Sequence, residues 1–173
     1  MIAKPNYSDA PDYCAYYFDL VTEQDLIAAL KRTAEETVQL FTTVPTEKEN
    51  YKYAGDKWTI KQLLRHLVDC ERVYTYRAMR FSRLDDTELP GFDENNYAGN
   101  DNTGQSKLKN LIGEYKAIRE ATIYLFEGMS DAMLDFKGKA NNRTSTARAW
   151  GWMAVGHNIH HNNIVKERYL KSV

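Results

Sequence analysis

Four long segments of the chain carry apolar residues at helical spacing, and this pattern constrains the fold more than any other feature of the sequence. The segments run from about residue 22 to 43, 59 to 83, 106 to 129 and 145 to 170. No segment has a convincing strand pattern. Four helices of about twenty residues each make a bundle roughly 30 Å long. We therefore expect an all-α fold, a four-helix bundle.

Capping residues mark the starts of the first two segments. Thr59 followed by Gln62 forms a capping box, in which each side chain bonds the backbone N–H of the other residue. Thr22 with Asp25 resembles the same signal, with Asp in place of Glu or Gln. We expect the first two helices to begin at these two threonines.

The joint between the second and third segments is unusually long and polar, from Leu84 to Gln105. Loops of this length are uncommon inside compact domains and are usually functional or disordered. About twenty extended residues span roughly 65 Å, enough to return along a whole bundle. The second and third helices can therefore be parallel neighbours, although the sequence does not require it. With 173 residues, the chain is most simply one domain, 1–173.

Composition argues against nucleic acid and membrane as partners. The chain has 23 basic and 24 acidic residues, interspersed along its length, whereas nucleic-acid binders usually carry a basic excess or stripe. No apolar stretch reaches the eighteen residues of a membrane span, and the N-terminus has no secretory signal. The two cysteines, Cys14 and Cys70, do not make a disulfide framework. These features favour a cytoplasmic protein.

The histidines are the residues most indicative of chemistry. Three of the four lie within five residues, at His157, His160 and His161, and the fourth is His66. His157 and His161 are one helical turn apart on the same face, the spacing of two ligands of one metal ion. Both project to the apolar side of their helix, and His66 shares a face with apolar residues of the second segment. We expect His66 to supply a third ligand from a facing helix.

A structural role has to be weighed against this metal site. A single histidine on an apolar face is usually a core residue with hydrogen-bond partners. Three inward histidines in one small bundle are different, because each buried imidazole needs partners for both nitrogens. One divalent metal ion would satisfy three of them together. The residues alone thus favour a divalent metal site.

The order of several short motifs also resembles the DinB/YfiT-like superfamily, over about residues 22 to 169. These motifs are Trp58-Thr59, His66-Leu67-x-Asp69, Leu89-Pro90-Gly91-Phe92-Asp93, Gly156-His157-x-x-His160-His161 and Arg168-Tyr169. The resemblance implies a four-helix bundle with up-down-down-up connections and a long crossover between helices two and three. It further implies a divalent metal held by His66, His157 and His161. Homodimers are frequent in that superfamily, so we expect one here.

Other polar residues near these histidines have less certain roles. Asp69 could orient the His66 ring, or simply pair with Arg72 on the surface. Cys70 could ligate but is more typical of a small buried residue, and His160 could lie at the rim of the site. Asp69 and Glu71 are the only suggestions for a general base, and no catalytic residue can be assigned. Substrate choice depends on loop residues such as Phe92, Tyr97 and Arg143.

The resemblance points to two kinds of chemistry on a small-molecule substrate. Some relatives are transferases or isomerases that use a low-molecular-weight thiol, and others are described as metal-dependent hydrolases. Three neutral histidines leave open positions on a metal, as in catalytic zinc sites. Zinc or nickel suits this ligand set, and iron is a further option. We expect metal-dependent activation of a thiol, with hydrolysis or a non-catalytic metal- or ligand-binding stress-response bundle as alternatives.

Overall fold

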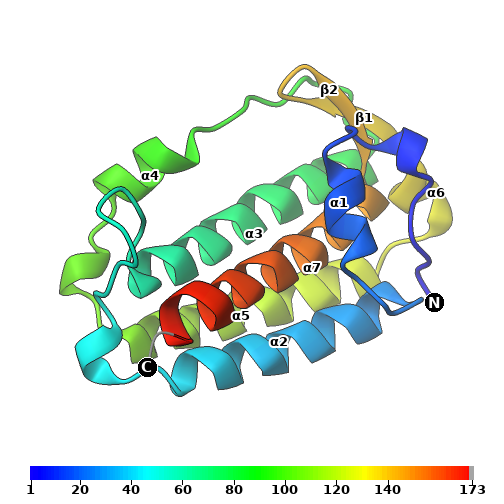
Figure 1. The fold of residues 1–173 in the computed structure, drawn as a ribbon. Helices are drawn as coiled ribbons and strands as arrows, with labels where there is room; N and C mark the ends of the chain where they lie inside the picture. The colour runs from blue at the N-terminus through cyan, green and yellow to red at the C-terminus, as the bar shows by residue number, and fades with distance from the viewer. Residues whose placement is uncertain (172–173) are drawn as a thin grey trace.

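The computed structural model describes residues 1–171, and four long helices dominate it (Figure 1). They are α2 (Leu26–Thr42), α3 (Ile60–Ser82), α5 (Leu108–Glu127) and α7 (Ala147–Ile164), the last continuing as a π-helix (Val165–Leu170). In Figure 1, α2 and α7 run in one direction while α3 and α5 run in the other. This is the expected up-down-down-up bundle. The parallel pair α3 and α5 pack against each other, and α3 also packs against α7.

The connection from α3 to α5 returns along the whole bundle, as its length allowed (Figure 1). It is not entirely irregular, because it contains a short helix, α4 (Glu94–Asn100), and a 3-10 turn (Thr103–Gln105). Asp93 caps α4 by accepting hydrogen bonds from the backbone N–H groups of Asn95 and Asn96, at 2.9 and 3.0 Å. A helix of seven residues is too short to show a periodic apolar pattern, so its sequence reads as a polar loop.

The expectation of no strand is wrong at one place. Strands β1 (Lys137–Ala140) and β2 (Arg143–Thr146) form an antiparallel hairpin. Asn141 and Asn142 make its turn with φ of 52° and 59°, the left-handed conformation that a two-residue hairpin turn requires and that Asn tolerates. Four-residue strands are too short for a period-two pattern, and the Asn-Asn pair was the available signal. Leu89 bridges to Ala140, which ties the long crossover to this hairpin.

The structure confirms one of the two expected helix starts and contradicts the other. Thr59 and Gln62 form the expected capping box at the start of α3. The expected start at Thr22 is wrong, because Asp25 is the N-cap of α2 and accepts a hydrogen bond from the Ala28 N–H at 3.1 Å. The Asp side chain is itself a good cap, so the helix begins three residues later than the Thr22 signal indicated.

Two short helices complete the fold, α1 (Cys14–Asp19) and α6 (Asp131–Asp135). The aromatic N-terminal segment forms α1, which packs against α7. No helix within residues 1–171 combines the length and apolar character needed to cross a membrane.

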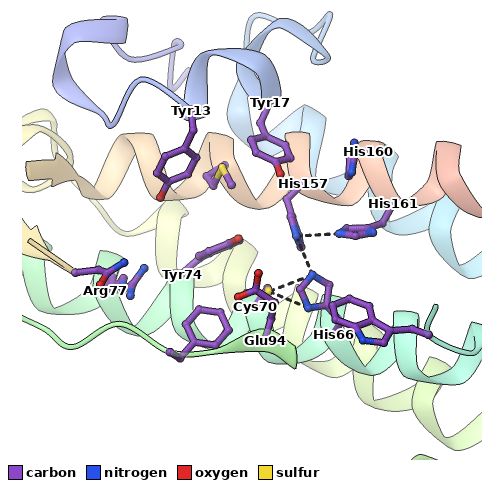
Figure 2. A pocket seen from close by; sticks show the side chains of 14 residues that line it. Tyr13, Tyr17, His66, Cys70, Tyr74, Arg77, Glu94, His157, His160 and His161 are labelled. Carbon is purple, nitrogen blue, oxygen red and sulfur yellow. Dashed lines mark hydrogen bonds between the residues drawn. The ribbon is translucent and has the colours of Figure 1, made fainter. Parts of the chain in front are cut away.

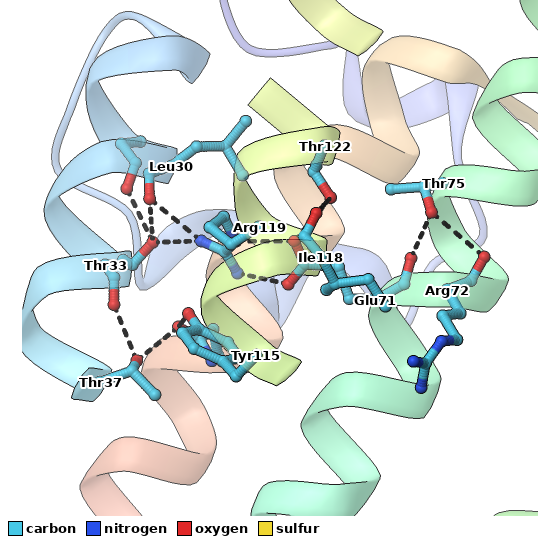
Figure 3. A network of polar contacts seen from close by, with 12 residues as sticks. Leu30, Thr33, Thr37, Glu71, Arg72, Thr75, Tyr115, Ile118, Arg119 and Thr122 are labelled. Carbon is cyan, nitrogen blue, oxygen red and sulfur yellow. Dashed lines mark hydrogen bonds and ion pairs between the residues drawn. The ribbon is translucent and has the colours of Figure 1, made fainter. Parts of the chain in front are cut away.

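A buried ion pair joins three of the long helices (Figure 3). Arg119 of α5 donates two hydrogen bonds of 2.7 Å to the Glu71 carboxylate of α3. Its other terminal nitrogen donates to the Leu30 carbonyl oxygen and to Thr33 Oγ1 of α2, at 3.1 and 2.8 Å. Thr122 donates to the same carboxylate at 2.7 Å. The network satisfies both buried charges and fixes α2, α3 and α5 relative to one another.

Candidate metal centre

Three histidine side chains from α3 and α7 converge on one point (Figure 2). Nε2 of His157 lies 3.1 Å from Nε2 of His66 and 3.1 Å from Nε2 of His161. The ligand atoms of the three residues all lie within 4.8 Å of one another. The structure thus brings together the same three histidines that the sequence singled out.

The surroundings keep these imidazoles neutral. Burial lowers the pKa of His66 to about 4, with a further contribution from the nearby His160. Burial also holds the pKa values of His157 and His161 well below the ordinary value, and the neighbouring histidines add to the effect. Neutral imidazole is the form that has a lone pair for a metal ion.

Hydrogen bonding alone cannot satisfy this cluster. A ring nitrogen has either one N–H or one lone pair in the ring plane. Nε2 of His157 therefore cannot make a good hydrogen bond to both of its 3.1 Å neighbours at once. Three lone pairs directed at one metal ion remove the conflict. Two nitrogens bound at about 2.1 Å in a tetrahedral site would be about 3.4 Å apart, close to the 3.1 Å that separates Nε2 of His157 from Nε2 of His66 and from Nε2 of His161. The donor set fits a divalent transition metal.

The histidines lie at one end of a cavity of about 420 Å³. Figure 2 shows Arg77 at the opposite end, with Cys70 and Glu94 between them. Most of the remaining walls are aromatic or apolar, formed by Tyr13, Tyr17, Trp58, Tyr74, Phe92 and Met153. This volume lies in the range of pockets that hold small organic molecules.

Two carboxylates that the sequence suggested as bases lie elsewhere. The Asp69 side chain accepts a hydrogen bond from Arg72 at 3.3 Å, so its surface ion pair is what the structure shows. Glu71 is 3% exposed and bound to Arg119 in the core. On a helix, Glu71 projects about 140° away from His66. Neither residue lines the cavity.

Cys70 and His160 lie beside the three histidines. Cys70 Sγ is 3.6 Å from both ring nitrogens of His66, so the sulfur lies beside the ring rather than on the axis of one nitrogen. Burial raises the pKa of the Cys70 thiol to about 12, which keeps it protonated. His160 is partly exposed, and its Nδ1 lies 3.0 Å from the Tyr16 hydroxyl, at the rim as expected.

Sequence reasoning missed several residues of the cavity. Tyr74 and Arg77 follow His66 by eight and eleven residues, so they share its face of α3, and this spacing was a signal that could have found them. Phe92, which the sequence suggested, does line the cavity; Tyr97 packs against Phe92, while Arg143 is not among the lining residues. Glu94 and Tyr17 come from segments whose position depends on tertiary packing.

Gly156 sets the distance between α7 and α1. A Cβ atom there would lie 2.1 Å from the Tyr17 carbonyl oxygen, which belongs to the α1 backbone and cannot rotate away. We expect Gly156→Ala to displace α1, to move Tyr17 away from the His157 ring, and to lower the free energy of unfolding by about 1–3 kcal/mol. Thermal denaturation measures the effect.

Gly113 of α5 is the matched control. A Cβ atom there has no neighbour within 4 Å. Gly113→Ala should stabilise the protein by about 0.5–1 kcal/mol through helix propensity. Equal effects of the two substitutions would contradict the close approach of α1 and α7.

Comparisons with known proteins agree with this architecture. A scan against family models matches the DinB superfamily over residues 29–165. A search of curated proteins gives no match. Among solved structures, YfiT from Bacillus subtilis, described as a probable metal-dependent hydrolase with an unusual four-helix bundle topology, is similar with a TM-score of 0.75 and 15% identity. The alignment covers 97% of this chain and 92% of that chain. At this identity the structural likeness shows the fold, whereas the family match extends over most of the sequence: the chain belongs to the DinB superfamily.

Proposed function

We propose that His66, His157 and His161 hold one divalent metal ion, zinc or nickel before iron, in a metal-dependent enzyme. The observation that carries the proposal is the convergence of three neutral Nε2 atoms at the end of an open cavity. Bound there, a divalent ion acts as a Lewis acid that polarises a carbonyl or lowers the pKa of a coordinated water or thiol.

The reaction we favour is attack of a low-molecular-weight thiol on an electrophile. The cavity of about 420 Å³ is large enough for two small reactants, and aromatic side chains line much of it. The histidines would place the sulfur at one end, while Tyr17 and Tyr74, whose rings lie 5.8 and 5.7 Å from the His157 ring, would confine the electrophile next to it. A thiol held there would release its proton to solvent before attack, so this reaction would need no protein base in the transition state.

Hydrolysis is the second candidate, and Glu94 is the observation that favours it. Glu94 is the one carboxylate among the residues described as lining the cavity, and in Figure 2 it lies between the histidines and Arg77, beside Cys70. A carboxylate there could accept the proton of an attacking water. The description of YfiT as a probable metal-dependent hydrolase points the same way.

An assay with metal-loaded protein separates the two reactions. In the first, glutathione displaces chloride from 1-chloro-2,4-dinitrobenzene, forming a C–S bond and releasing chloride and a proton. In the second, p-nitrophenyl acetate is hydrolysed without thiol. We expect the thiol reaction to be accelerated by the metal-loaded protein and to be unaffected by Glu94→Gln.

The Glu94→Gln variant also shows which result would favour hydrolysis over thiol transfer. Ester hydrolysis that falls about 100-fold in Glu94→Gln, with no thiol reaction, would replace the first candidate by the second. Protein that binds metal but accelerates neither reaction would contradict both and favour a binding role.

A further inference from the structure

Arg77 is a buried cation in the cavity wall without an acidic partner. It is 5% exposed and lies eleven residues after His66 on the same face of α3, about 16 Å along the helix axis. Among the residues described as lining the cavity it is the only arginine or lysine. Figure 2 shows it at the end of the cavity opposite the histidines.

The contacts of Arg77 hold it in place but leave its charge unpaired. One terminal nitrogen donates to the Pro90 carbonyl oxygen at 3.0 Å, and the guanidinium carbon lies 4.7 Å from the centre of the Trp150 ring. Within residues 1–171, no carboxylate forms an ion pair with it. Arg119, the other buried arginine of α3 and α5, is bound by both oxygens of Glu71. Burying a charge without a counter-ion is costly, so an unpaired guanidinium facing a cavity indicates an anionic ligand.

We propose that Arg77 binds the carboxylate of a small organic substrate whose reacting group lies at the three histidines. The inference deepens the proposed function, since it takes this cavity as the substrate site. A planar guanidinium matches a carboxylate through two parallel N–H···O bonds. A single cation suits a monoanion better than a phosphate dianion. Tyr13, Tyr74 and Phe92 also line the cavity and would contact the apolar body of the same molecule.

A purely structural role for Arg77 explains only part of these observations. The hydrogen bond to Pro90 attaches the crossover segment to α3, and stacking on Trp150 stabilises the cation. A residue that only links the crossover segment to α3 does not need a formal charge at the cavity surface. The two roles differ in one measurable respect, which is the binding of an anion compared with a neutral molecule of the same shape.

Calorimetric titration with benzoate and with its neutral isostere benzamide tests the proposal. The protein is first stripped of metal with the uncharged chelator 1,10-phenanthroline and then dialysed, so that benzoate has no metal to bind. We expect the wild type to bind benzoate about tenfold or more tightly than benzamide. Arg77→Gln should lose about tenfold or more in benzoate affinity and little in benzamide affinity.

Two further variants keep the test decisive. Arg77→Lys keeps the positive charge but lacks the planar guanidinium, so it should retain part of the preference for benzoate over benzamide. This variant replaces Arg77→Gln in the test if Arg77→Gln does not fold. Arg83→Gln removes an exposed charge from the end of the same helix and should bind benzoate like the wild type. No benzoate binding to the wild type up to about 10 mM, or equal affinity of Arg77→Gln and wild type for benzoate, would overturn the subsite. Since the protein is metal-free, these outcomes are independent of whether the histidines bind a metal.

Discussion

His157→Ala should abolish tight metal binding while the protein stays helical. His157 is the central residue of the cluster, because its Nε2 is 3.1 Å from the ring nitrogens of both His66 and His161. Removing it leaves two ligands that no longer share a close neighbour, and we expect the affinity for zinc or nickel to fall about 100-fold or more. Alanine is a better helix former than histidine, so α7 should persist. Elemental analysis of tag-free protein and circular dichroism measure the two effects.

His160→Ala is the matched control for this substitution. His160 is three residues further along the same helix, but its Nδ1 lies 3.0 Å from the Tyr16 hydroxyl rather than facing the cluster. This variant should keep one metal ion per chain. Stoichiometric metal in His157→Ala, or a wild type that stays metal-free after reconstitution with zinc and nickel, would show that the ligand assignment is wrong.

Glu71→Gln should destabilise the fold more than the loss of any surface ion pair. The side chains of Glu71 and its partner Arg119 are 3% and 1% exposed. Removal of the Glu71 charge leaves the Arg119 guanidinium buried without a counter-ion. Breaking such a pair costs about 3–5 kcal/mol. For a chain of this size, that corresponds to a decrease in Tm of roughly 10 °C. Thermal and denaturant unfolding, followed by circular dichroism, measure it.

The ion pair between Lys31 and Glu127 provides the comparison. Its side chains are 58% and 41% exposed, so Glu127→Gln should cost less than about 1 kcal/mol. The double variant Glu71→Leu with Arg119→Met removes both charges and should recover much of the stability lost in Glu71→Gln. If Glu71→Gln unfolded like the wild type, the network in Figure 3 would not hold the three helices together.

Local features of the sequence were reliable where short-range interactions decide the structure. The capping box at Thr59 predicted the start of α3, because both of its hydrogen bonds form within four residues. His157 and His161 were correctly placed on one face, because helical geometry sets their spacing. The length of the connection between α3 and α5 permitted the parallel arrangement, which the structure has (Figure 1).

The surroundings of α3 show what the sequence left open. His66, Asp69 and Glu71 lie within six residues, and each faces a different environment: the cavity, the surface and the core. Asp69 and Glu71 were both suggested as bases, because sequence spacing gives their directions relative to His66 but not the helices that they face. Arg119, which comes from α5, binds Glu71 in the core. Arg72, three residues further along α3, binds Asp69 at the surface.

The sequence by itself determined the four helices and the pair of histidines on α7, because these depend on hydrogen bonds and side-chain periodicity within a few turns. Only the tertiary structure decided that His66 meets that pair, that Glu94 and Arg77 share its cavity, and that Glu71 does not. These outcomes depend on contacts between segments far apart in the chain. They follow from the packing of α1, α4 and the crossover around α3 and α7, which burial of apolar surface and the close approach at Gly156 bring about.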